Sequence, residues 1–204
     1  MKSSKHIKTL MGSVCIIISF IIIGCTVKVP LSNYNPVFTG EYSGYKGKRV
    51  FLENFDNQAK DTSIWHYYSL DKKFNYSKSR AFSAQDQKGG ATYIESLHNY
   101  FWYAFRDAFT KLGMLVSNVD NPDLAAPTMW VTLLSITDVE YYVSVTVQKR
   151  GITVFTEKYT IQELPLAEKD RNPAALEQRA YRMTNRLIES IIKDPGFQEG
   201  LTEP

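Results

Sequence analysis

Apolar residues recur with a helical period in the middle of the chain. From Thr92 to Leu112 they are spaced three or four residues apart, which places them on one helical face. Gly113 follows directly and suits a C-terminal cap. The pattern predicts a helix over 92–112 whose buried stripe consists of Ile94, Leu97, Phe101, Phe105, Ala108 and Leu112.

A period of two predicts a sheet. Val143, Val145 and Val147 alternate with polar or aromatic residues, as in a half-buried strand. Whether 129–148 is one bent strand or two, with a break at Thr137-Asp138, stays open from the pattern. Strands are predicted over 49–55, 114–117, 129–136, 141–148 and 152–161.

A second helix is predicted to begin at Asn172-Pro173, a polar cap followed by proline at the first helical position. Pro195-Gly196 is expected to stop it. The element order predicts an α+β fold, in which a mostly antiparallel sheet has two helices packed on one face. The stripe of this second helix is Leu176, Ala180, Met183, Leu187 and Ile191.

The rest of the chain divides into three parts. Residues 25–47 contain several prolines and glycines without a sustained period, which predicts a flexible tether. Residues 48–204 are expected to form a single domain. Within it, 56–91 is an insertion in which a hairpin over 64–76 is possible and 83–90 is a loop.

The first 24 residues have the form of an export signal. Three lysines within the first eight residues precede an apolar run over 10–23, and the small Gly24 stands before Cys25. The apolar run is shorter than the roughly 20 residues that a membrane span needs. The alternative is an uncleaved N-terminal anchor.

The end of this signal, Ile22-Ile23-Gly24-Cys25, resembles the lipobox of bacterial lipoproteins. The resemblance implies cleavage between Gly24 and Cys25 by signal peptidase II, and a diacylglycerol thioether on Cys25. Several acyl chains anchor a protein firmly, whereas one holds it only marginally. Thr26 after the cysteine implies the outer membrane, with the domain facing the periplasm, or the outer face of the plasma membrane in an organism without one.

Charge and cysteine content narrow the functional class. The chain has 24 basic and 21 acidic residues, and three of the lysines belong to the signal, so the mature part is neutral. A neutral chain argues against nucleic-acid binding, which needs a basic face. Cys15 leaves with the signal and Cys25 carries the lipid, which leaves no disulfide for the mature domain.

No catalytic motif occurs in the mature sequence. His66 and His98 are its histidines, and without a cysteine partner they make a zinc site improbable. Neighbouring acids such as Asp138 and Glu140 are expected to be solvated. We therefore predict no enzyme, no cofactor and no metal; a hydrolase would need a cleft that gathers His66 or His98 with a carboxylate.

Aromatic residues are the candidate binding groups. Trp65 and Tyr67 lie in the insertion, and Tyr100, Trp102 and Tyr103 lie on the first helix, away from its buried stripe. A helix that is aromatic all round is either covered by another segment or presents a binding surface. These five residues are the predicted partner-binding set, and the alternative is that 56–91 packs over the helix.

The element order also resembles small periplasmic lipoproteins, through stretches at 130–136, 143–147 and 151–155. These are the YajG-like proteins, the ABC-transport auxiliary lipoproteins and the lipoprotein subunit of the lipopolysaccharide-assembly translocon. The resemblance implies a non-catalytic, membrane-tethered component that binds an envelope protein partner. The alternative is a lipid- or glycan-binding carrier in which the aromatic residues line a cleft.

Overall fold

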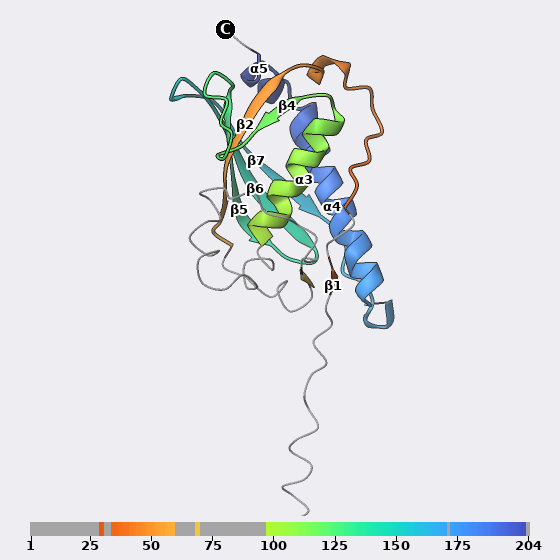
Figure 1. Cartoon of the computed structure of the whole chain (residues 1–204). Coiled ribbons are helices and arrows are strands. Elements are labelled where there is room, and N and C mark those ends of the chain that lie inside the picture. Colours follow the sequence, from red (N-terminus) through yellow and green to blue (C-terminus); the bar gives the residue numbers. More distant parts are fainter. Residues whose placement is uncertain (1–28, 31–33, 60–67, 70–96, 171, 203–204) are drawn as a thin grey trace, which may run out of the picture.

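The computed structural model describes residues 29–30, 34–59, 68–69, 97–170 and 172–202, and within them a five-stranded sheet is accompanied by three α-helices (Figure 1). The strands of the sheet are β2 (Arg49–Asn57), β4 (Leu115–Ser117), β5 (Thr128–Ile136), β6 (Glu140–Lys149) and β7 (Ile152–Gln162). The helices are α3 (Leu97–Lys111), α4 (Pro173–Lys193) and α5 (Pro195–Gly200). The short elements are β1 (Val29–Pro30), which pairs with β3 (Tyr68–Ser69), and the 3-10 turns η2 (Ser43–Tyr45) and η5 (Glu168–Asp170).

The strand order in the sheet is β4-β2-β5-β6-β7. β2 pairs in parallel with β4 and β5, whereas the longer ladders β5–β6 and β6–β7 are antiparallel. The α3 helix supplies the crossover that a parallel β2–β4 pair requires. The α+β fold with a mostly antiparallel sheet is therefore confirmed, and its first part is parallel.

The predicted alternation of β6 is confirmed. Its buried side chains from Tyr141 to Val147 alternate with partly exposed ones. β5 and β6 are two strands and not one bent strand. The Thr137 hydroxyl accepts hydrogen bonds from the Val139 and Glu140 backbone N–H groups at 3.2 and 2.9 Å, and this arrangement forms the turn between them.

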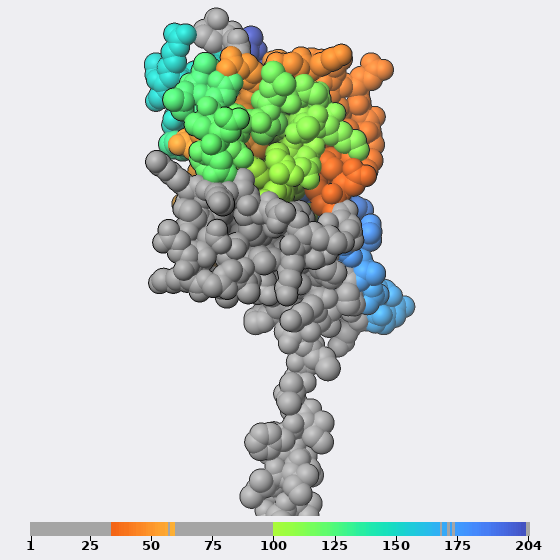
Figure 2. Space-filling model, in the orientation of Figure 1, coloured from red at the N-terminus to blue at the C-terminus, as the bar shows by residue number. Residues whose placement is uncertain are grey.

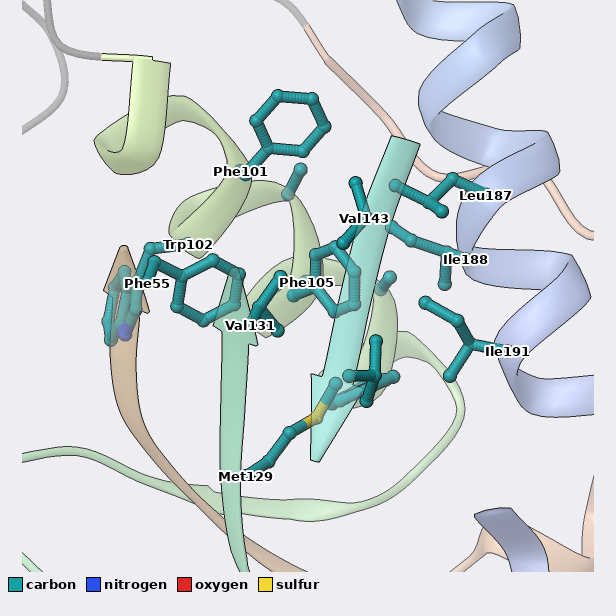
Figure 3. Close-up of a cluster of buried hydrophobic side chains, with 14 of the residues drawn as sticks. Phe55, Phe101, Trp102, Phe105, Met129, Val131, Val143, Leu187, Ile188 and Ile191 are labelled. Carbon is teal, nitrogen blue, oxygen red and sulfur yellow. The ribbon is translucent and has the colours of Figure 1, made fainter. Parts of the chain in front are cut away.

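α3 and α4 lie next to each other over one face of the sheet, with α3 against β2 and α4 against β7. Figure 3 shows Phe101 and Phe105 of α3 converging with Val143 of β6 and Ile188 of α4. These four side chains are fully buried. Burial of this apolar stripe from both helices is the main force that holds helix and sheet together.

The second predicted helix ends before Pro195-Gly196, as expected, but a further short helix begins at the same dipeptide. The chain ends α4 at Lys193 and starts α5 at Pro195. The Asp194 carboxylate accepts hydrogen bonds from the Gly196 and Phe197 N–H groups, at 2.8 and 3.4 Å, and so caps the new helix. Proline at the first position of a helix is favourable, so here the same dipeptide ends one helix and begins the next.

Residues 34–45, here called the strap, differ from the flexible tether expected over 25–47. The Tyr34 hydroxyl donates to Asn185 Oδ1 at 2.7 Å, and the Thr39 N–H donates to Glu189 Oε1 at 3.1 Å. Tyr45 is buried in the core. The tether expectation is therefore wrong for the strap, because aromatic residues spaced along it pack on the domain.

The strap has a contact whose removal should be measurable. The Tyr45 hydroxyl donates to the Ile192 carbonyl at 2.6 Å, and that carbonyl also accepts from Gln198 Nε2 at 3.0 Å. Because Gln198 still donates to the Ile192 carbonyl in the variant, Tyr45→Phe is expected to lower the free energy of unfolding by only about 1 kcal/mol. Urea denaturation of the variant measures this difference.

Tyr42→Phe is the matched control, since the Tyr42 hydroxyl is buried and makes no hydrogen bond in the described part of the chain. Its removal is expected to change stability by less than about 0.5 kcal/mol. Equal losses for the two variants would contradict the assignment of the Tyr45 bond.

Candidate functional site

The predicted aromatic surface of α3 is buried. Tyr100, Trp102 and Tyr103 expose 1%, 3% and 3% of their surface. The Tyr100 ring lies 6.1 Å from that of Tyr34 in the strap, and burial raises the pKa of the Tyr100 hydroxyl well above its usual value. The Arg106 guanidinium lies over the Tyr103 ring at 4.5 Å. These three aromatic residues are buried and do not form an exposed surface.

The other predicted site residues lie outside the described residues. This holds for Gly24, Cys25, Trp65 and Tyr67, and also for His66 and the side chain of His98. Across the described ranges, no group of three or more His, Cys, Asp or Glu side chains is arranged to hold a metal ion. No described helix has the length and apolar character needed to cross a membrane.

Exposed apolar side chains gather instead at the sheet end formed by the β6–β7 hairpin and the 118–127 loop. Of seven large apolar residues that are exposed in the described part of the chain, four lie here. We call these four the hairpin-end surface: Leu124, Trp130, Ile152 and Val154. In Figure 2 the green loop near residue 120 and the cyan hairpin near residue 150 lie together at the upper left.

Two hollows shape this surface, and Leu124, which is 83% exposed, lines both. The first, of about 600 Å³, is lined by Phe51, Glu53, Asn54, Val119, Pro122, Leu124 and Trp130. The second, of about 440 Å³, is lined by Arg49, residues 124–127, Lys149, Arg150, Ile152 and Val154. Both volumes fall within the range of known ligand and anchor pockets, roughly 300–1,000 Å³.

The rim of the second hollow is cationic. Arg49 Nε donates to Asp123 Oδ2 at 2.6 Å, and this hydrogen bond lowers the pKa of the Asp123 carboxyl. Asp123 thus offsets the charge of Arg49, whereas Arg150 adds a positive charge beside Ile152. The Lys149 ammonium group donates to the Glu199 and Thr202 carbonyls at the end of α5. The hollow therefore combines an apolar floor with a positive edge.

Arg150 occupies an unfavourable backbone conformation for its residue type. Its φ is +52° and that of Gly151 is +78°, as a two-residue hairpin turn requires. Glycine or asparagine is the usual choice at the first of these positions. Arginine at this position therefore carries a backbone cost that asparagine or glycine would reduce.

The first hollow has a different character. The register of β2 against β5 shifts between Leu52 and Asn54, which leaves Glu53 as the extra residue of a bulge. Trp130 Nε1 donates to Glu53 Oε2 at 2.6 Å, while 39% of the Trp130 surface stays exposed. Sequence reasoning missed this site because Trp130 and Val154 are ordinary strand residues until the bulge and the sheet end are known.

No protein-family model matches the chain, and no curated protein matches it by sequence. Among solved structures it is similar to protein XCC0632 from Xanthomonas campestris, described with the family model DUF330, with 10% identity over 87% of this chain and 97% of that one and a TM-score of 0.47. It is also similar to lipoprotein GNA1162 from Neisseria meningitidis, with 11% identity over 71% of this chain and 99% of that one and a TM-score of 0.27. At these values the function has to be argued from the residues of this chain.

Proposed function

We propose that this protein is a lipid-anchored lipoprotein of the bacterial envelope and acts as a non-catalytic binding or scaffold component. Cys25 carries the anchor, and the outer membrane is its location, with the domain facing the periplasm. The hairpin-end surface holds a protein partner. The lipobox resemblance of residues 22–25 supports the anchor, and the exposed apolar cluster supports the partner.

The observation that carries the partner proposal is the concentration of exposed apolar side chains at one end of the domain. Ile152 is 69% exposed and Leu124 is 83% exposed. Exposed apolar clusters with a polar rim mark interaction sites, because leaving them in water costs free energy that association recovers. The positive charge of Arg150 on the rim favours a partner surface with acidic residues around an apolar anchor.

The location of this surface fits a scaffold. Figure 1 shows β1, which lies nearest in sequence to Cys25 among the described elements, at one end of the molecule. The β6–β7 hairpin lies at the other end. A domain anchored near β1 would hold its hairpin-end surface away from its own membrane, where a second envelope protein can reach it.

The alternative is a lipid- or glycan-binding carrier, and packing argues against its lipid-binding form. A carrier needs an enclosed apolar cavity between sheet and helices. In this protein Phe105, Val131 and Leu187 fill that space and are 0%, 1% and 0% exposed (Figure 3). The described hollows around Leu124 are open to the surface, which suits a docked partner better than an enclosed acyl chain.

The test is cross-linking in cells, followed by purification of the full-length protein and quantitative mass spectrometry of what comes with it. The double variant Ile152→Ser, Val154→Ser is expected to lower recovery of the partner at least about tenfold, since each buried aliphatic side chain contributes roughly 1.5–3 kcal/mol. Val37→Ser and Leu164→Ser are matched controls, because both residues are exposed apolar side chains outside the surface. Equal recovery from all variants would sink the proposal.

Arg150→Asn separates docking from folding. Asparagine accepts the positive φ of this turn position more readily than arginine, so thermal stability is expected to hold or rise slightly. The loss of the guanidinium group is expected to lower the affinity for an acidic partner several-fold. A drop in recovery without a drop in melting temperature assigns the effect to the surface itself.

A further inference from the structure

The first hollow combines an indole ring with a carboxylate, a chemistry that docking of a partner on the aliphatic side chains of Ile152 and Val154 does not use. Trp130 lies in its wall with its indole N–H tied to the Glu53 carboxylate at 2.6 Å, and 39% of the residue is exposed. The bulge in β2 brings Glu53 to this position, since a regular strand would have no extra residue there. The wall of the hollow thus presents an aromatic ring, held in one orientation by its hydrogen bond, next to a carboxylate.

The lining of this hollow defines what it can bind. Phe51, Val119, Pro122, Leu124 and Trp130 are apolar, and the polar groups are Glu53 and Asn54. Among the described lining residues, Glu53 is the only ionisable one, and its carboxylate gives that part of the wall a negative charge. A carboxylate repels anions and accepts hydrogen bonds from hydroxyl and amide donors. The hollow therefore favours a neutral ligand rich in donors that also has an apolar face.

We propose that this hollow binds a pyranose ring of a neutral glycan. The C–H groups on one face of such a ring carry partial positive charge and pack against the negative face of an indole. Its hydroxyl or acetamido N–H groups would donate to Glu53, and Asn54 can both donate and accept. The proposal goes beyond the partner-binding function. Trp130 also belongs to the hairpin-end surface, but the partner test replaces Ile152 and Val154 and leaves Trp130 and Glu53 in place.

The experiment titrates the full-length, lipidated protein with a soluble tetramer of β-1,4-linked N-acetylglucosamine by calorimetry. The protein is kept in a detergent without a sugar headgroup, because a glycoside detergent would compete. Trp130→Ala removes the stacking surface and is expected to weaken binding at least about tenfold. Trp130→Phe keeps a smaller aromatic face and loses the five-membered ring with its N–H, so its affinity is expected to fall less than that of Trp130→Ala, to within about threefold of the original.

Two further arms test the charge argument. Glu53→Gln keeps an acceptor oxygen but removes the charge, and it is expected to weaken binding about threefold to tenfold because charge-assisted hydrogen bonds are the stronger kind. A tetramer of galacturonic acid, which is anionic, is expected to bind at least about tenfold more weakly than the neutral tetramer. The double variant Ile152→Ser, Val154→Ser should bind the neutral sugar as well as the unaltered protein does.

The outcomes are distinct. The proposal fails if the unaltered protein shows no heat of binding with the neutral tetramer, or if Trp130→Ala binds it equally well. If Trp130→Ala does not fold, the comparison of Glu53→Gln and Trp130→Phe with the unaltered protein decides in its place. Sugar binding that fails while partner recovery persists would overturn this inference alone, and the reverse result would overturn only the protein-partner proposal.

Discussion

Replacing Cys25 with serine is expected to abolish lipid labelling and signal removal together. The thioether forms on the cysteine sulfur, and a serine hydroxyl does not replace it in this class of signal. With metabolically supplied, labelled fatty acid, incorporation into Cys25→Ser is expected to fall to background. The intact mass should also increase by that of the 24-residue signal, less the lost lipid.

The matched control uses the other cysteine. Cys15 lies within the apolar run of the signal, so Cys15→Ser is expected to leave both lipid labelling and the mature mass unchanged. The membrane fraction is a weaker readout, because an uncleaved apolar run can itself hold a chain on a bilayer. Labelling that survives in Cys25→Ser, or disappears in Cys15→Ser, contradicts the lipobox assignment.

The largest effect on stability is expected from Phe105→Ala. The Phe105 side chain is fully buried, and its ring makes edge contacts with Phe55 at 5.3 Å and Phe109 at 5.7 Å between ring centres. Truncation removes apolar contacts and leaves a cavity between α3 and the sheet, which costs about 3–5 kcal/mol. Since a domain is stable by about 5–15 kcal/mol, much of that margin is lost.

Thermal and urea unfolding measure this loss, which should appear as a drop in melting temperature of about 10 °C or more. Phe105→Leu keeps most of the apolar volume and is expected to lose less than half as much. Leu164→Ala, at a residue that is 86% exposed, is expected to change stability by less than about 0.5 kcal/mol. A loss below about 1 kcal/mol for Phe105→Ala would show that this region repacks without a cavity.

Several elements could be predicted because their signals are local. The alternation of valines defines β6, and Asn172 followed by Pro173 marks the start of α4, where the Asn172 side chain accepts the Ala175 N–H. Gly113 lies two residues after the end of α3, and its φ of +81° is typical of the glycine that follows a helix C-terminus. Caps, turns and periodicity depend on neighbours within a few residues, so the sequence expresses them directly.

The position of α5 shows how a local signal can be read correctly and still mislead. Proline and glycine at 195–196 were expected to end the second helix, and they do follow its end. The Tyr159 hydroxyl donates to the Asp194 carboxylate at 2.8 Å, from a strand far away in the chain. The cap that restarts the helix is thus held from β7, and no local rule includes that contact.

The candidate site could not be predicted for a related reason. A helical wheel separates Tyr100, Trp102 and Tyr103 from the buried stripe of α3, but it does not tell what packs on the second face. The strap packs on this face at Tyr100. Because the strap lies more than 50 residues away in the sequence, a helical wheel of α3 does not reveal that contact. Trp130 and Ile152 are apolar strand residues that stay exposed. Trp130 points to the face of β5 opposite to buried Met129 and Val131, and Ile152 begins β7 at the hairpin turn.

The sequence by itself determined the alternating strands, the two long amphipathic helices and the α+β class, and it predicts an export signal with a lipobox-like end. These properties arise from patterns in which each residue acts on its near neighbours. Only the tertiary structure decided which apolar side chains stay in water, because exposure depends on segments that meet from distant parts of the chain. The hairpin-end surface and the pairing of Glu53 with Trp130 belong to that second kind.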